Sequence, residues 1–138
     1  ITATDGELSV VTTGFATQYV ATLGETMSAG TAVYMKSDGK VWKAKADAVA
    51  TMPCCGFITT GGDADGTSAL VQTAVMASVL GGGALTVGGK CFVSAATAGQ
   101  ITQTAPSGAS NVIQPVGIMA TAANLLVNIG EAVVRPAA

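Results

Sequence analysis

Residues 32 to 44, AVYMKSDGKVWKA, decide the fold because they predict a β-hairpin around an Asp-Gly turn. Asp-Gly supplies the positive φ angles of a type I′ turn, whose twist matches that of the flanking strands. A two-residue turn at Asp38 and Gly39 places Met35 opposite Trp42. We expect one face to lie in a core and the other to contact solvent or a partner. The core face carries Val33, Met35, Trp42 and Ala44, and the other carries Tyr34, Lys36, Val41 and Lys43.

The same unit returns near residue 90. The two copies can be aligned at their glycines. The first reads LGETMSAGTAVYMKSDGKVWKA, residues 23 to 44, and the second reads GGGALTVGGKCFVSAATAGQITQT, residues 81 to 104. The second turn is longer, because Gly88 and Gly99 are 11 positions apart where Gly30 and Gly39 are 9 apart. The corresponding pairs are Gly30 and Gly88, Tyr34 and Phe92, Gly39 and Gly99, and Val41 and Ile101.

A second correspondence follows each hairpin. MPCCGFI at residues 52 to 58 matches QPVGIM at residues 114 to 119, since in each a proline precedes a glycine and an apolar strand. An alternating run then comes after each copy, SALVQTAVMAS in the first and NLLVNIGEAVV in the second. The sequence therefore predicts an internal pseudo-repeat over about residues 24 to 80 and 82 to 134.

The chain is predicted to be mainly β, as a small β-sandwich or barrel built from two related hairpin-plus-strand halves. Eighteen glycines punctuate it, and only KAKADAVATM, residues 43 to 52, favours a helical turn. We expect a single β domain over residues 22 to 138 and an extended N-terminal arm, or an edge strand, over residues 1 to 21. The candidate residues for contact between this arm and a neighbouring subunit are Leu8, Val10, Val11, Phe15 and Tyr19.

Charge is scarce and unevenly placed. Charged residues make up 10% of the chain, where soluble domains usually carry about 25%. From Gly66 to Gly130 the only charged residue is Lys90, so we expect this half to meet protein rather than water. The net charge of −2 gives no basic surface for nucleic acid. The sequence also lacks the roughly 20 continuous apolar residues of a membrane span.

The residue types that usually carry catalysis are sparse. The chain has no histidine, which excludes Ser-His-Asp and Cys-His arrangements. Cys54 and Cys55 are adjacent and Cys91 is distant, which is neither a zinc-ligand spacing nor a disulfide framework, so buried thiols in a reducing cytoplasm are expected. GGDADGTS, residues 61 to 68, begins like a calcium loop, but the position that requires Glu is Ala74. We therefore expect no enzyme activity, cofactor or metal site.

The whole pattern of turns and apolar positions resembles a group of small structural proteins of tailed bacteriophages. The residues that carry the resemblance run from LGETMSAGTAVYMKSDGKVWKA through MPCCGFI and GGALTVGGKCFVSAATAGQITQTAPSG to VIQPVGIMATAANLLVNIG, covering about residues 22 to 130. Members are similar to capsid decoration, or cement, proteins, and related domains occur in head fibres and other virion appendages. The N-terminal segment and the pair Cys54 and Cys55 depart from that pattern.

The resemblance implies a virion protein on the capsid surface, assembled in the cytoplasm of a host bacterium. Its expected partners are the major capsid protein and further copies of itself, a trimer being one arrangement, with no nucleic acid or membrane partner. Tyr34, Lys36 and Lys43 are the candidate partner-contact residues. Other roles stay open at this point, namely a host-binding module, or a subunit of a head fibre, tail appendage or self-assembling tube or filament.

Overall fold

The computed structural model describes residues 17 to 59, 66 to 81 and 85 to 136. Apart from one 3-10 turn, η2 (Val49–Thr51), the regular structure of this part of the chain is all β, as the sequence predicts. The turn falls inside the segment for which a helical turn was expected. The strands are β1 (Gln18–Leu23), β2 (Ala32–Met35), β3 (Lys40–Lys43), β4 (Gly56–Ile58), β5 (Ser68–Gln72), β6 (Val75–Ser78), β7 (Lys90–Val93), β8 (Ile101–Thr102), β9 (Val112–Ile113), β10 (Pro115–Met119), β11 (Asn124–Val127) and β12 (Val133–Val134).

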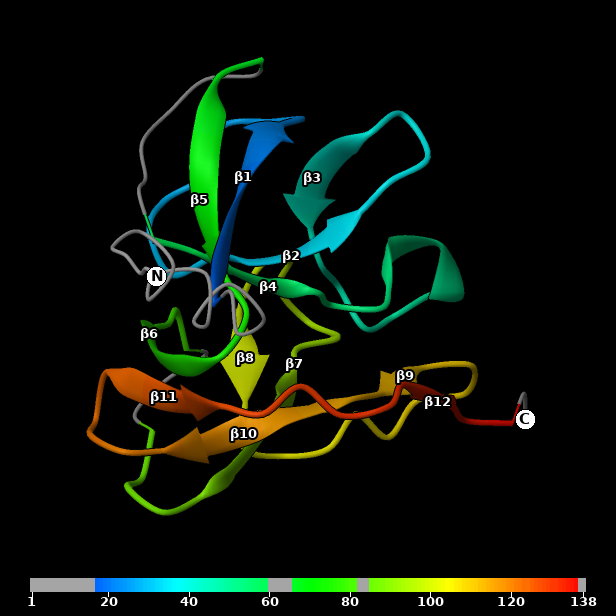
Figure 1. Ribbon diagram of the computed structural model, residues 1–138. Helices are drawn as coiled ribbons and strands as arrows, with labels where there is room; N and C mark the ends of the chain where they lie inside the picture. The colour runs from blue at the N-terminus through cyan, green and yellow to red at the C-terminus, as the bar shows by residue number, and fades with distance from the viewer. Residues whose placement is uncertain (1–16, 60–65, 82–84, 137–138) are drawn as a thin grey trace, which may run out of the picture.

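The strands form two lobes, stacked one above the other in Figure 1. The first lobe is a closed five-stranded barrel in the order β1-β3-β2-β4-β5. The second lobe is a five-stranded sheet in the order β6-β11-β10-β7-β8, and a parallel bridge between Gly81 and Ile101 joins its two ends. β9 and β12 form a separate two-stranded sheet beside the second lobe. The prediction of a small barrel is confirmed.

The two lobes repeat the same strand order and the same register. Val33 pairs with Gly56 in the first lobe, and Cys91 pairs with Gly117 in the second. The parallel pair that closes the first barrel joins Leu23 to Val41, and its counterpart is the bridge at Gly81. Even the turns match, because the N–H of Gly30 donates to Ile58 O at 2.7 Å and that of Gly88 donates to Met119 O at 2.7 Å. The internal repeat is therefore a duplication of a whole five-stranded unit.

The limits of the repeat differ from those predicted. The repeating units run from Gln18 to Gln72 and from Val75 to Val127, because β1 is the counterpart of β6. The expectation of an extended arm is wrong for residues 18 to 21, since they pair with β5, and the pairing of β1 with β3 begins at Thr22. Sequence inspection missed this strand because its partners are distant in the chain, and one of the pairings is parallel. Residues 1 to 16 lie outside the described part of the structure.

The register of the first hairpin also differs from the prediction by one residue. Tyr34 pairs with Trp42, and Met35 with Val41. The turn has three residues, because the N–H of Lys36 donates to Lys40 O at 3.0 Å and only Gly39 has a positive φ, of 83°. The Asp38 carboxylate accepts the N–H of Lys40 at 2.9 Å, which supports a turn followed by a left-handed glycine rather than type I′.

This one-residue shift moves the residues of β3 to the opposite face from the one predicted, while those of β2 keep theirs. Val41 joins Val33 inside the first barrel, and Trp42 lies on the same side as Tyr34, toward the second lobe. Met35, which was expected in the core, is exposed. Both faces of this hairpin are thus covered at its base, one by the barrel interior and one by the neighbouring lobe.

The core has two parts. A smaller cluster fills the first barrel and includes Leu23, Val33, Val41, Ile58 and Val71. A larger cluster fills the second lobe and extends across the junction to the outer face of the first lobe. Its members from the first lobe and the chain between β3 and β4 are Ala32, Tyr34, Ala44, Ala46, Met52, Cys54 and Phe57. Because one cluster spans the junction, the lobes pack as one unit.

Backbone hydrogen bonds also link the lobes. The N–H of Ala32 donates to Gly99 O at 2.8 Å, and the N–H of Gly99 donates to Ala44 O at 2.7 Å. Further along the junction, the N–H of Ala46 donates to Ser94 O at 2.9 Å and that of Val112 to Ala46 O at 2.7 Å. Bonds of this kind fix the relative orientation of the lobes, because breaking them leaves buried polar groups without partners.

Candidate functional site

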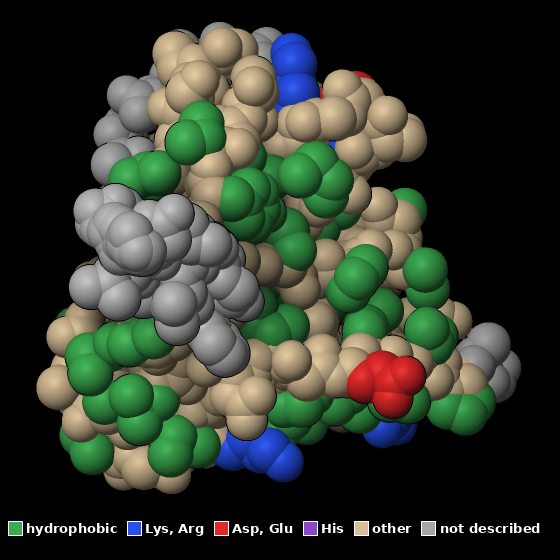
Figure 2. All heavy atoms as spheres, in the orientation of Figure 1, with side chains coloured by type: hydrophobic (Ala, Val, Ile, Leu, Met, Phe, Trp, Pro, Cys, Tyr) green, Lys and Arg blue, Asp and Glu red, His purple; other side chains and the backbone are tan. Residues whose placement is uncertain are grey.

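An apolar groove lies at one side of the junction between the lobes. Its volume is about 480 Å³. The walls come from the connection between β3 and β4 and from the sheet of β9 and β12, and Glu131 is the one ionisable carboxylate among the lining residues. The lining residues are Val49, Met52, Pro53, Cys54, Val112, Gln114, Gly130, Glu131, Ala132 and Val134. Hydrophobic side chains gather at this side of the molecule in Figure 2.

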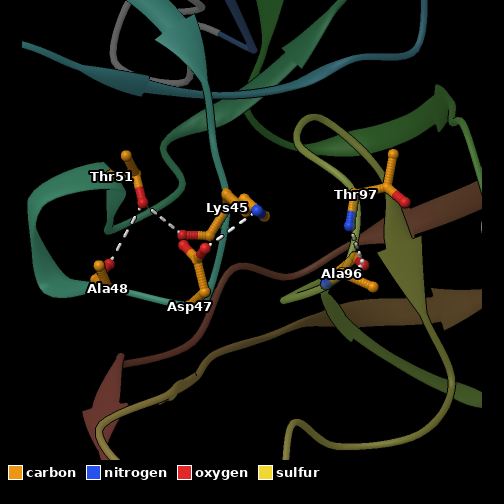
Figure 3. Close-up of polar contacts among 7 residues, drawn as sticks. Lys45, Asp47, Ala48, Thr51, Ala96 and Thr97 are labelled. Carbon is orange, nitrogen blue, oxygen red and sulfur yellow. Dashed lines mark hydrogen bonds and ion pairs between the residues drawn. The ribbon is translucent and has the colours of Figure 1, made fainter.

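Local hydrogen bonds fix the first wall, shown in Figure 3. The Thr51 hydroxyl donates to Lys45 O at 2.5 Å, and the N–H of Lys45 donates back to Thr51 O at 3.3 Å. The ammonium of Lys45 pairs with Asp47 at 3.0 Å. These bonds close a compact loop around η2, and Val49 at its start is 59% exposed. An apolar side chain held outward by a closed loop can contact a partner without losing much conformational entropy on binding.

The second wall is a short antiparallel pair. Val134 pairs with Val112, and Val133 pairs with Ile113. Next to them, the N–H of Arg135 donates to Asn111 O at 2.8 Å. Val133 and Val134 are 57% and 49% exposed. β12 is the edge strand of its two-stranded sheet, and exposed edges can pair with an extended segment of another chain.

Gln114 forms the floor of the groove and joins three segments. Its side chain is buried, between β9 and β10. The N–H of Cys54 donates to its Oε1 at 2.7 Å, and its Nε2 donates to Cys54 O at 3.1 Å and to Gly130 O at 3.1 Å. All its hydrogen-bonding groups face protein atoms, so the side chain is a structural clamp.

Burial keeps the three cysteine thiols of the chain protonated and therefore unreactive. Complete burial raises the pKa of the Cys54 thiol to about 12, and burial also raises the pKa of Cys55. The Tyr19 hydroxyl lies 3.2 Å from the Cys55 sulfur, and burial is the main cause of its raised pKa. Burial raises the pKa of the Cys91 thiol as well. Since the thiolate is the nucleophile and the metal ligand, these groups are neutral hydrophobes near pH 7.

The structure separates the three predicted partner-contact residues. Tyr34 is 7% exposed and belongs to the core cluster at the lobe junction, so its proposed contact with a partner is corrected. The physical reason is that the second lobe covers the face of β2 opposite Val33, where solvent or a partner was expected. Lys36 is exposed, and Lys43 is partly buried, with its N–H donating to Glu25 at 3.0 Å.

The candidate arm residues have different outcomes. Tyr19 belongs to β1 and packs against the first barrel, within its own chain. Tyr19 thus has contacts within its own chain, and its assignment as an inter-subunit contact stays a prediction. Leu8, Val10, Val11 and Phe15 lie outside the described residues.

Trp42 is enclosed by its own lobe. Lys36 Nζ lies 4.3 Å from the centre of the ring, and the indole N–H donates to the Asp38 carboxylate at 3.1 Å. A side chain on Gly24 would lie 2.2 Å from the indole, so the ring packs directly on that glycine. These contacts fix the position of the ring against its own hairpin.

Sequence reasoning did not find the groove. Its walls combine the loop after the first hairpin with the C-terminal end of the described chain, and no local pattern brings these together. One signal was present, because the pair Val133 and Val134 follows the end of the repeat, where no strand of the duplicated unit needs it.

No family model matches the chain, and no curated protein matches its sequence. Within the described residues, no group of three or more His, Cys, Asp or Glu side chains is placed to hold a metal ion. The same part of the chain has no helix with the length and apolar character to cross a bilayer.

Proposed function

We propose that this chain is a structural virion protein that decorates and stabilises a bacteriophage capsid as a homo-oligomer, binding across the joints between major capsid subunits. The observation that carries the proposal is the apolar groove at the lobe junction, held open by a closed loop on one side and an edge strand on the other. The resemblance of residues 22 to 130 to small virion proteins points to the same role.

The proposed action is mechanical. The two lobes share one core cluster and are tied by backbone bonds at Gly99 and Ala46, so a load on one lobe passes to the other. Apolar surface buried on a capsid contributes about 25 cal/mol per Å², before the costs of association. The exposed side chains of Val49 and Val134 supply such a surface on either side of the groove.

A second role is favoured by one specific observation, the exposed edge of β12. A subunit of a fibre, tail appendage or filament joins its neighbours by strand addition along such an edge. Under this alternative the protein is an assembly subunit in its own right and needs no shell beneath it.

Labelled-antibody electron microscopy on purified particles, with copy number from quantitative mass spectrometry, separates the two roles. Decoration gives hundreds of copies spread evenly over the head. A few copies at a vertex or tail, or label on filaments without heads, supports the alternative. Protein that labels no particle overturns the virion assignment.

Two matched variants then test the groove. We expect Val134→Asp to weaken sedimentation with empty shells at least about tenfold, since a charge in an apolar contact must be desolvated. Val20→Asp is the control, because Val20 is 67% exposed on β1 and lies outside the groove. Equal binding by both variants would show that the groove is not the contact.

A further inference from the structure

Each lobe has a row of side chains that runs across four equivalent strands, and the two rows differ in how much of them is buried. In the second lobe the register places Met76, Leu126, Ile118 and Lys90 side by side across β6, β11, β10 and β7. The same register in the first lobe places Gln18, Gln72, Phe57 and Ala32 side by side across β1, β5, β4 and β2. We call these the second row and the first row.

One end of the first row is covered by the second lobe. Phe57 and Ala32 are fully buried and belong to the core cluster that spans the junction, whereas Gln18 at the other end is exposed. The tip of the β7–β8 hairpin covers the buried end, because the N–H of Ala32 donates to Gly99 O and the N–H of Gly99 donates to Ala44 O. Gly99 packs so closely that an added side chain would lie 2.7 Å from the Thr31 methyl carbon.

The second row has no such cover within the described residues. Met76, Leu126 and Ile118 are 45%, 40% and 45% exposed. β6, β11 and β10 contain no charged residue, and a hollow of about 290 Å³ lies beside Ile118 and Lys90. Hydrophobic side chains gather over β6 and β11 at the lower left of Figure 2. Contiguous apolar faces of this kind mark interaction sites.

The first lobe carries an exposed hairpin tip that is equivalent to the tip covering the first row. The counterpart of Gly99 is Gly39, at the tip of the β2–β3 hairpin, and an added side chain there would meet no atom within 4 Å. Residues Lys36 to Gly39 are all exposed. Within the described residues, each chain therefore presents an exposed hairpin tip on the first lobe and an exposed row on the second. The register makes Lys90 the counterpart of Ala32, the row residue that bonds to Gly99, so the equivalent seat for a hairpin tip is the Lys90 end of the second row.

We propose that copies of this chain join head to tail, with the β2–β3 hairpin tip of one copy seated at the Lys90 end of the second row of the next, beside Ile118. A contact between different faces generates a ring where the rotation closes and a filament where it does not. This inference deepens the proposed function by naming the contact that makes the homo-oligomer, and in that respect it rests on it.

Analytical ultracentrifugation of the purified full chain tests the contact without any capsid. Wild-type protein should sediment as a species larger than the 13.4 kDa monomer, with a mass that rises with concentration. Ile118→Lys, in the row, and Ser37→Arg, at the tip, should each weaken self-association at least about tenfold, as charges do in a central apolar contact. Ser37 is exposed, and its replacement leaves the turn bond of Asp38 in place. Val20→Asp is the control and should associate like wild type, because Val20 is exposed on β1, outside both the row and the tip.

Mixing gives the sharpest result. The row variant keeps an intact tip, and the tip variant keeps an intact row, so an equimolar mixture of the two should form a one-to-one complex. A wild-type chain that stays monomeric at millimolar concentration would overturn the proposal. Variants that assemble unchanged, or a mixture that forms no complex, would also overturn it.

Circular dichroism checks that each variant folds, and Ile118→Ser is a milder alternative to Ile118→Lys. Particles labelled by antibody together with a monomeric purified chain would leave decoration standing and reject only this contact.

Discussion

Phe57 and Ile118 occupy equivalent positions in the two lobes, yet Phe57 is fully buried and Ile118 is 45% exposed. The backbone position is the same, and only the surroundings differ. The duplicated unit has therefore placed one strand position in a core and its copy on a surface.

This pair gives a direct comparison of stability. Phe57→Ala should lower the free energy of unfolding by about 3 to 5 kcal/mol, the usual cost of removing a buried phenylalanine. Ile118→Ala should lower it by less than about 1 kcal/mol, because water already reaches that side chain. Urea unfolding followed by Trp42 fluorescence measures both. Similar losses would mean that Ile118 is covered in the free chain.

Gln114 and Gln103 form a second matched pair. Each bonds to both the N–H and the C=O of one distant residue, Cys54 for Gln114 and Thr86 for Gln103. Because Gln114 is buried, Gln114→Ala leaves the Cys54 groups without partners and should cost about 2 to 3 kcal/mol in unfolding free energy. Gln103→Ala should cost under about 1 kcal/mol, since water can replace its bonds. A smaller loss at Gln114 than at Gln103 would contradict its role as a clamp.

The two hairpin glycines separate backbone strain from packing. Gly39 and Gly99 have φ values of 83° and 82°, so alanine at either costs about 1 to 2 kcal/mol from the left-handed conformation. Gly99→Ala should cost more than Gly39→Ala, because its new methyl would press on Thr31 at the lobe junction. Thermal unfolding by calorimetry compares them. Equal melting temperatures would argue against the tight junction.

Cys54 predicts a loss of stability in alkali. Its pKa in the folded chain is about 12, above the ordinary thiol value of about 9. Its contribution to the free energy of unfolding is therefore complete below pH 9. That contribution is lost as the pH rises toward 12, at about 1.4 kcal/mol per pH unit, because the unfolded chain releases the thiol proton first. Cys55 and Tyr19 act in the same direction. Unfolding free energies at pH 8 to 11 should fall less steeply in Cys54→Ala than in wild type, and parallel curves would reject the assignment.

Tyr34 and Lys36 distinguish a structural from a surface role. Tyr34→Ala should destabilise the chain by about 3 kcal/mol or more, because the ring packs in the junction core. Lys36→Glu should change stability by less than about 1 kcal/mol, as exposed charges do. Chemical denaturation reports both values. A fully folded Tyr34→Ala protein of wild-type stability would restore the original face assignment.

The strand content and the duplication could be predicted because they depend on local residues. Glycines at Gly30, Gly39, Gly88 and Gly99 need positive φ angles, and their spacing carries the repeat whatever the tertiary structure. Alternating apolar residues then place the strands between them. These signals were sufficient for the two hairpins and for the strand after each.

The register and the closure could not be predicted, because they depend on distant or competing contacts. The Asp38 side chain accepts the N–H of Lys40 within a three-residue turn, and the register of this turn places Trp42 on the same face as Tyr34. The sequence of β1 does not by itself identify a barrel strand, because its partners β3 and β5 are distant in the chain. The groove could not be predicted, because it forms only where the loop around Val49 lies opposite Val134 in the folded chain.

Because each lobe comes from one continuous stretch of chain, synthesis completes them in turn. All five strands of the first barrel have been made by Gln72, before β6 begins at Val75. The first lobe can therefore close on the ribosome, while the face around Phe57 waits in water until the segment that carries Gly99 emerges. In that interval the nascent chain exposes a large apolar surface, and crowded ribosomes translating the same message bring such surfaces together. The rate at which residues 73 to 101 emerge from the ribosome thus sets how long this face of the new protein stays uncovered.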